Sequence, residues 1–176
     1  YLKSLGHRAP KSSVSEYLEW FEDAFFLFTV RLFDPSLIRS NVNPKKIYCV
    51  DHSLVSSVSS GILTNTGHLL ENLVFTALRR LCSDICYYRT RGGREVDFIV
   101  TLRGRSRMLV QVCESLAEPQ TRKREISALS EAMEEQGLTD GTIVTRNEDE
   151  RLETPGGVIN IVPAWRFLLE LPESAE

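Results

Sequence analysis

The 176-residue chain contains no long apolar run and no signal-peptide pattern, so we expect a cytoplasmic protein that does not span a membrane. It also contains no phosphate-binding loop of the form GxxxxGK(S/T), which predicts that this chain alone has no ATP site and does not hydrolyse ATP. Its first residue is Tyr1 rather than an initiator methionine, and we expect the sequence to be an excerpt of a longer protein.

Cysteine is scarce, and its spacing excludes two further classes of protein. The four cysteines are Cys49, Cys82, Cys86 and Cys113. Cys82 and Cys86 have three residues between them, but no second Cys or His pair stands nearby, which argues against a zinc site. Nothing indicates a disulfide framework either, so we expect free thiols in a reducing compartment.

The chain as a whole has no surplus of basic side chains, although one segment does. The 21 Lys and Arg residues face 24 Asp and Glu residues, and the net charge of −3 argues against nucleic-acid binding over the whole surface. Between residues 79 and 107, however, eight arginines stand against three acidic residues, a local charge of +5. Two basic turns at one edge of a sheet could bind phosphates; the alternative is a solvated charged hairpin.

Residues 12–51 predict a helix, a strand, a loop and a second strand. Apolar residues recur at helical spacing over 12–24, among them Tyr17 and Phe21. AFFLFTVRLF and KIYCVD are typical of strands, and DPSLIRSNVNPKK between them is typical of a loop. This order matches the last helix and the wing of a winged helix-turn-helix, which we assign to residues 1–51. The alternative is a helix and a hairpin that pack on the main core.

The strongest patterns lie in residues 67–113. Residues 67–81 predict an amphipathic helix with Glu71 on the flank of its apolar stripe. Strands follow over DICYYRT, REVDFIVT and MLVQVC, separated by the turns TRGGR and LRGRSR. Strand alternation places Val96 and Phe98 on one face and Asp97 on the other. If the last two strands pair, Asp97 and Gln111 can converge at one end of the sheet.

The remaining chain alternates between helices and strands. Residues 118–136 predict a long helix, GTIVT and GGVINIV two buried strands, and AWRFLLEL a last helix that Pro163 opens. Such alternation indicates an α/β fold with a mixed sheet flanked by helices, which we place at residues 52–176.

Two acidic residues stand out in these patterns. An aspartate such as Asp97, inside an apolar strand, is costly unless it is paired or binds a cation. The alternative for Asp97 is a salt bridge to a neighbouring arginine. For Glu71 the alternative is a surface position or one half of a salt bridge.

At GHLLENLVFTALRR, RGGREVDFIV and LVQVCESL the sequence resembles the C-terminal region of prokaryotic AAA+-type ATPases, a domain of unknown function. QTRKREISALSEAMEE, GTIVT, VPAWRFLLE and KIYCVD fit the same family, so the resemblance covers essentially the whole chain. It implies a restriction-endonuclease-like domain that follows an ATPase module and a winged helix. The implied core is αβββαβ, of the PD-(D/E)XK nuclease type.

The resemblance also implies a set of site residues. In active nucleases of this superfamily a helix Glu, a strand Asp and an E-x-K motif bind a divalent metal ion and orient a water molecule. Glu71 and Asp97 match the first two, Gln111 matches the second carboxylate, and Cys113 matches the lysine. Mg²⁺ or Mn²⁺ would then be held by Glu71, Asp97 and Gln111. An amide is a weaker ligand than a carboxylate and a thiol supplies no positive charge, so we expect weak or absent cleavage.

Three hypotheses follow. The first is a nuclease-fold DNA-binding module that serves an ATPase module located elsewhere in the full protein. The arginines expected to contact its DNA are Arg89, Arg91, Arg94, Arg103 and Arg105. The second is an active, divalent-metal-dependent DNA endonuclease. The third is a protein-interaction or oligomerisation domain with a relic nuclease site. Its partner could be a second copy of the chain, which would give a homo-oligomer.

Overall fold

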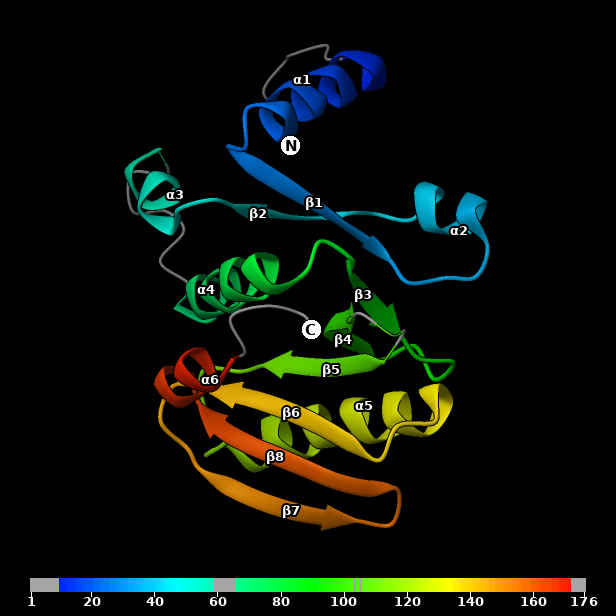
Figure 1. The fold of residues 1–176 in the computed structure, drawn as a ribbon, viewed down its shortest axis with the longest axis vertical. Helices are drawn as coiled ribbons and strands as arrows, with labels where there is room; N and C mark the ends of the chain where they lie inside the picture. Colours follow the sequence, from blue (N-terminus) through cyan, green and yellow to red (C-terminus); the bar gives the residue numbers. More distant parts are fainter. Residues whose placement is uncertain (1–9, 59–65, 103, 105, 172–176) are drawn as a thin grey trace.

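The computed structural model describes residues 10–58, 66–102, 104 and 106–171 (Figure 1). In chain order its elements are α1 (Lys11–Asp23), β1 (Leu27–Leu32), α2 (Leu37–Val42), β2 (Lys46–Cys49), α3 (His52–Val58), α4 (Thr66–Leu81), β3 (Ile85–Arg89), β4 (Glu95–Thr101), β5 (Arg107–Val112), α5 (Pro119–Gln136), β6 (Asp140–Thr145), β7 (Glu150–Thr154), β8 (Gly157–Pro163) and α6 (Ala164–Glu170). Among the helices of this described part, none combines the length and the apolar character that crossing a membrane requires.

One mixed sheet runs through the molecule in the order β2-β1-β3-β4-β5-β6-β8-β7 (Figure 1). β3, β4 and β5 form an antiparallel meander because short turns connect them, whereas β6 lies parallel to β5 after the crossover through α5. β8 lies parallel to β6, and β7 pairs antiparallel with β8 at the edge. The expected α/β architecture, a mixed sheet flanked by helices, is therefore confirmed.

Each face of the sheet carries its own apolar core. On one face, Phe75 and Leu78 of α4 pack with Val110 of β5, and α6 extends the same core. On the other face, Leu129 of α5 packs with Leu109 of β5. Neighbouring residues of one strand thus enter opposite cores, as strand alternation requires.

The hairpin of β1 and β2 continues this sheet, because β1 pairs antiparallel with β2 and parallel with β3. The Tyr48 ring also stacks on Phe75 of α4, with ring centroids 4.4 Å apart. The Asn72 amide accepts a hydrogen bond from the Cys49 N–H at 2.8 Å and donates one to the Cys49 carbonyl at 3.0 Å. The hairpin therefore packs on the main core, as in the alternative interpretation of this segment; the boundary at residue 51 stays a prediction.

Helix α1 is present where its periodicity predicts it, and within the described residues it packs mainly along β1. Its aromatic side chains lie largely in solvent, with Tyr17 54% and Trp20 62% exposed. Phe25, in the turn after the helix, is 68% exposed and has a φ of 54°, a strained conformation for a bulky residue. Exposed aromatic side chains of this kind are what the protein-interaction hypothesis would use.

The sequence patterns do not predict α2 or β7. Helix α2 lies in the stretch expected to be a loop, where the Ser36 hydroxyl accepts a hydrogen bond from the Arg39 N–H at 3.5 Å and caps the first turn. Strand β7 has the sequence ERLET, in which charged residues take the place of the apolar residues that a strand pattern requires. It pairs with β8 alone, and edge strands commonly carry charged residues because their outer side faces water.

Candidate functional site

A bulge in β4 sets the direction of the Asp97 side chain. Between two successive residue pairs of the β3–β4 ladder, β4 has two residues, Asp97 and Phe98, whereas β3 has only Tyr87. The extra residue breaks the alternation, so Val96 enters the core beside α5 and Phe98 enters the core beside α4. The prediction that Val96 and Phe98 share one face is therefore wrong, because strand pairing rather than local pattern produces the bulge.

Glu71 of α4 and Asp97 of β4 meet at Lys46, the first residue of β2. Lys46 Nζ lies 2.7 Å from Asp97 Oδ1, 3.1 Å from Glu71 Oε1 and 3.0 Å from Glu95 Oε1. The Tyr48 hydroxyl donates a hydrogen bond to Glu71 Oε1 at 2.6 Å. We call these five residues the Lys46 cluster. The structure thus brings two predicted site residues together around a cation that the sequence patterns did not predict.

The Lys46 ammonium group keeps its proton at neutral pH. Burial opposes the charge, but the carboxylates of Asp97 and Glu71 outweigh it and raise the pKa of Lys46 above its ordinary value. Burial and the Glu71 carboxylate also raise the pKa of Tyr48, so its hydroxyl keeps its proton and remains a donor. The alternative for Asp97, a salt bridge, is therefore present, but its partner is a lysine from β2 rather than a neighbouring arginine.

Asp97 is a buried carboxyl group of the cluster, and its pKa is raised. Burial and the Glu71 carboxylate raise the pKa of Asp97 to about 6, against the opposing effect of Lys46. Both of its oxygens have partners, since Oδ1 accepts from Lys46 and Oδ2 accepts from the Val112 N–H at 2.9 Å. A buried carboxyl group with a perturbed pKa beside a specific charge is a candidate for function.

This pKa predicts how stability changes with pH. The pKa of Asp97 is about 6 in the folded chain against 3.8 ordinarily, so between these values the folded protein binds the proton more tightly than the unfolded chain does. Proton binding to Asp97 therefore stabilises the folded state at low pH, and this contribution to the free energy of unfolding is lost as the pH rises through that range. Relative to the wild type, Asp97→Asn should gain about 2–3 kcal/mol of stability between about pH 4 and pH 7.

Urea denaturation of both proteins in EDTA, at several pH values, measures this difference. The titratable groups around Asp97 are Lys46, Glu71, Glu95 and Tyr48, and both proteins contain them. Asp84→Asn is the matched control, because Asp84 is exposed. An Asp97→Asn protein whose stability follows that of the wild type in parallel at every pH would contradict the perturbed pKa.

The third predicted motif lies on the other side of the sheet, facing α5. Gln111 Nε2 donates to Glu125 Oε2 of α5 at 2.7 Å, and its Oε1 accepts from the Asp97 backbone N–H at 3.1 Å. The Cys113 thiol donates to the Ser115 carbonyl at 3.1 Å. Asp97 and Gln111 are thus in contact as expected, but the Gln111 amide is not directed at the Glu71 and Asp97 carboxylates.

The residues present do not fit a divalent metal ion while Lys46 lies between the carboxylates. Among the residues that the structure describes, no group of three or more His, Cys, Asp or Glu side chains could hold a metal. Glu71 and Asp97 direct oxygens at the ammonium group instead, and Gln111 is engaged with Glu125. The proposed metal set of Glu71, Asp97 and Gln111 stays a prediction.

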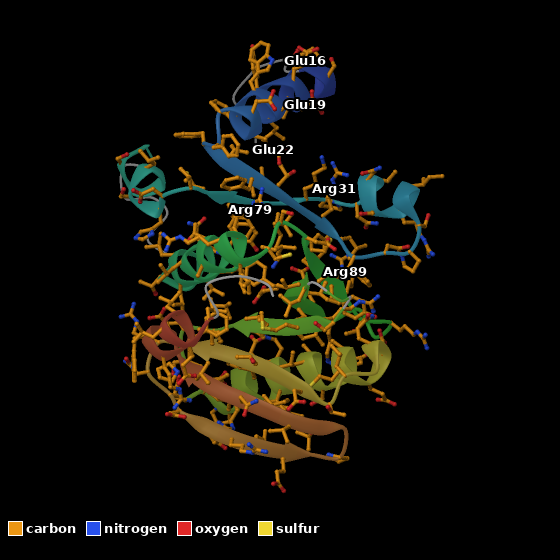
Figure 2. All side chains as sticks on the ribbon, viewed as in Figure 1. Glu16, Glu19, Glu22, Arg31, Arg79 and Arg89 are labelled. Atoms are coloured by element: carbon orange, nitrogen blue, oxygen red, sulfur yellow. The ribbon has the colours of Figure 1, made fainter. Side chains whose placement is uncertain are left out.

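Two of the arginines expected to bind DNA are engaged in ion pairs. Arg89, labelled near the end of β3 in Figure 2, lies 3.3 Å from Glu95, and Arg94 lies 2.6 Å from Glu131 of α5. Arg91 is exposed. Of these three arginines, Arg91 is therefore the best placed to meet a phosphate group.

Two glutamates of α5 hold the turn that carries Arg91. Glu135 Oε1 accepts from the Arg91 N–H at 2.9 Å, and Glu131 Oε1 accepts from the Gly92 N–H at 2.8 Å. These carboxylates fix the backbone of the turn, and they also reduce the local charge of +5 to +3. Two predicted arginines lie outside the described residues: Arg103 and Arg105.

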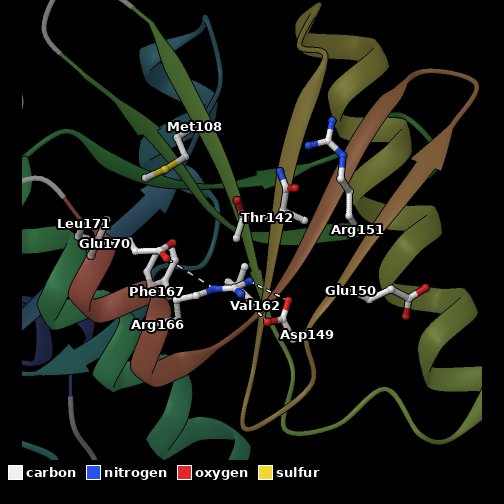
Figure 3. A pocket seen from close by; sticks show the side chains of 11 residues that line it. Met108, Thr142, Asp149, Glu150, Arg151, Val162, Arg166, Phe167, Glu170 and Leu171 are labelled. Atoms are coloured by element: carbon white, nitrogen blue, oxygen red, sulfur yellow. Dashed lines mark hydrogen bonds and ion pairs between the residues drawn. The ribbon is translucent and has the colours of Figure 1, made fainter.

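A groove of about 390 Å³ opens beside α6, away from the predicted site (Figure 3). Its lining includes Phe167 and Met108 as well as the polar side chains of Thr142 and Arg151. These residues belong to α6 and to β5, β6 and β7, whereas the Lys46 cluster belongs to α4, β2 and β4. No sequence motif indicated this groove, and none of the predicted site residues lines it.

Pattern analysis missed Lys46 and Tyr48, which lie 25 and 23 residues before Glu71 in the chain. One signal was available: alternation in KIYC places Lys46 and Tyr48 on the same face of a strand. It could not show which acidic residues that face would meet, because the contact depends on how β2 and α4 pack.

Comparison with known proteins gives a family and one relative. Residues 66–167 match the family model described as "Domain of unknown function (DUF4143)". The uncharacterized protein MJ1544 of Methanocaldococcus jannaschii is 32% identical over 177 residues, an alignment that covers 96% of this chain and 38% of that protein. The chain thus spans well under half the length of this curated relative. No solved structure matches.

Proposed function

The chain belongs to the DUF4143 family, and we propose that it is a nuclease-fold DNA-binding module with weak or no cleavage activity. The observation that carries the proposal is the meeting of Glu71 and Asp97 at the bulge of β4. Bulges are frequent beside active sites, where they redirect a side chain, and a buried carboxylate beside a second, partly buried one is costly without a cation. This geometry supports a site derived from metal-dependent chemistry.

The order of elements supports a PD-(D/E)XK-type core. α4, β3, β4, β5, α5 and β6 follow the order αβββαβ, with three antiparallel strands and then a parallel strand after a crossover helix. Glu71 lies on the first helix of this set and Asp97 on its second strand. These are the positions at which the superfamily pattern has its first two acidic residues.

The groups at the third motif support weak or absent cleavage. The Gln111 amide binds Glu125, and burial raises the pKa of the Cys113 thiol, which keeps it uncharged. Neither group supplies the positive charge that stabilises a phosphoryl transition state. An active, divalent-metal-dependent endonuclease remains the alternative proposal, and it requires a metal ion to displace Lys46.

Contact with DNA is supported by the turn between β3 and β4. The glutamates of α5 hold its backbone while the Arg91 side chain stays exposed. A preorganised arginine loses less freedom when it meets a phosphate group than one on a flexible loop does. From the family resemblance we also propose that the module serves an AAA+-type ATPase module; the alignment covers only 38% of the MJ1544 relative, which leaves room in that protein for a further module.

Fluorescence anisotropy with labelled linear and branched DNA tests the proposal. We expect the wild type to bind both substrates at low salt, with an affinity that falls as salt increases. Joint replacement of Arg91, Arg103 and Arg105 by alanine should weaken binding to every sequence and lower the salt slope by about one per lost phosphate contact. Arg151→Ala is the matched control, because Arg151 is exposed on β7 at the far edge of the sheet.

The same reactions with Mg²⁺, Mn²⁺ or EDTA test cleavage, with Asp97→Ala as the comparison. The proposal expects binding without metal-dependent cleavage. Cleavage that needs metal and disappears in Asp97→Ala would instead establish the endonuclease alternative. No binding by the wild type at low salt would contradict both functions and favour the protein-interaction hypothesis.

A further inference from the structure

The cation position in the Lys46 cluster is complete without a metal ion. An ammonium group has three N–H donors, and three carboxylate oxygens lie within hydrogen-bonding distance of Lys46 Nζ. They belong to Asp97 at 2.7 Å, Glu95 at 3.0 Å and Glu71 at 3.1 Å. Two of these oxygens, on Asp97 and Glu71, accept hydrogen bonds from the ammonium group, and the Glu95 carboxylate adds an ion pair, so the charge of Lys46 is balanced within the cluster.

The chain on both sides of Lys46 is held in place. Before it, the Pro44 carbonyl accepts a hydrogen bond from the Tyr87 hydroxyl at 2.7 Å. After it, Tyr48 binds Glu71 and stacks on the ring of Phe75. The ammonium group also lies 5.9 Å from the centroid of the Tyr87 ring. The contacts of the chain around Lys46 with α4 and β3 therefore fix the position of this residue and direct its side chain at the carboxylates.

A divalent metal ion would compete with Lys46 for the same atoms. Mg²⁺ and Mn²⁺ favour carboxylate oxygens, and Lys46 engages Glu71 Oε1 and Asp97 Oδ1. The other oxygen of Asp97 accepts from the Val112 N–H. Two positive charges would also repel each other strongly at so short a distance in a partly buried site.

We infer that the Lys46 ammonium group is the resident cation of the Glu71–Asp97 carboxylate pair and excludes a divalent metal ion from it. The third motif has Cys113 where the superfamily pattern has a lysine. A lysine is nevertheless present at the carboxylate pair, because β2 supplies Lys46, which occupies the position expected for the metal ion. This inference rests on the nuclease-like interpretation of the carboxylate pair in the proposed function, but it does not depend on DNA binding.

Removal of the ammonium group should convert the cluster into a metal site. Oxygens of Glu71, Glu95 and Asp97 all lie within 3.1 Å of one point, the position of Lys46 Nζ. Lys46→Met removes the charge and keeps an unbranched side chain. As they lie in the described part of the chain, these three carboxylates do not form a metal site, so in the variant they would have to move into the space that the ammonium group leaves before they could share a Mn²⁺ ion.

A Mn²⁺ titration of the full chain tests the inference. Binding is measured as the decrease of the EPR signal of free Mn²⁺. We expect Lys46→Met to bind one equivalent at least about 10-fold more tightly than the wild type, and Lys46→Met combined with Asp97→Asn to lose this site. Lys46→Arg keeps the charge and should behave as the wild type. Lys45→Met, at the exposed neighbouring lysine, controls for general effects of losing a charge.

Equal Mn²⁺ affinity of the wild type and Lys46→Met would overturn the inference. A folded Lys46→Met protein that binds no Mn²⁺ would also overturn it. If Lys46→Met does not fold in metal-free buffer, Lys46→Gln, whose amide still donates to the carboxylates, replaces it, and the same two results decide. DNA binding measured on the same samples separates the two proposals: its absence would contradict the proposed function and leave the metal result standing.

Discussion

Lys46→Ala should lower the free energy of unfolding by about 2 kcal/mol, between the loss for a broken buried ion pair and that for a surface pair. The side chain is 22% exposed and serves three carboxylates, so its removal leaves Glu71 and Asp97 with uncompensated negative charge. Urea denaturation at neutral pH measures the effect. Added Asp97→Asn should recover part of the loss, because it removes one of the two carboxylates that repel each other.

Lys45→Ala is the matched control for this experiment. Lys45 is exposed and precedes Lys46 directly, so its replacement should change stability by no more than about 0.5 kcal/mol. Equal effects of the two alanine substitutions would mean that the Lys46 cluster does not stabilise the fold, and would remove the basis for its role as a resident cation.

Phe75→Ala should lower the free energy of unfolding by about 3–5 kcal/mol, the usual loss for a buried phenylalanine. The Phe75 side chain is 1% exposed and lies within aromatic contact distance of rings from three strands. Its ring centroid is 4.4 Å from that of Tyr48, 5.7 Å from that of Phe28 and 6.2 Å from that of Phe98. The substitution should therefore weaken the β1–β2 hairpin and the central sheet together.

Native-state hydrogen exchange measures this joint effect. We expect the Cys49 N–H in the hairpin and the amides of β4 to lose protection in parallel in Phe75→Ala, as one cooperative unit. Phe25→Ala, which truncates an exposed ring of the same type, should leave both groups protected. Loss of protection in only one of the two segments would instead show that residues 1–51 and 52–176 unfold separately.

The fold from α4 to β5 is well predicted from the sequence because its signals are long and regular. α4 shows helical periodicity over 16 residues, and a Gly-Gly turn separates β3 from β4. α2 has only 6 residues, too few for a periodic pattern, and proline signals at both ends favoured a loop. Local pattern is weakest where an element is short or carries many charges.

The candidate site could be predicted only in part, because strand pairing and packing complete it. Glu71 and Asp97 are recognisable from the sequence and do meet in space. The bulge at Asp97, which reverses the expected face of Val96, depends on the pairing with β3. Lys46 lies 51 residues before Asp97, and its contact with that carboxylate exists only because β2 packs on α4.

A crystal structure of the wild type grown with excess Mn²⁺ tests the central claim most directly, because anomalous scattering locates manganese without reference to any ligand. We predict that Lys46 Nζ will lie between Glu71 and Asp97 and that no anomalous peak will be present there. An anomalous peak bound to Asp97, with Lys46 displaced from the carboxylates, would contradict the claim that this chain supplies its own cation.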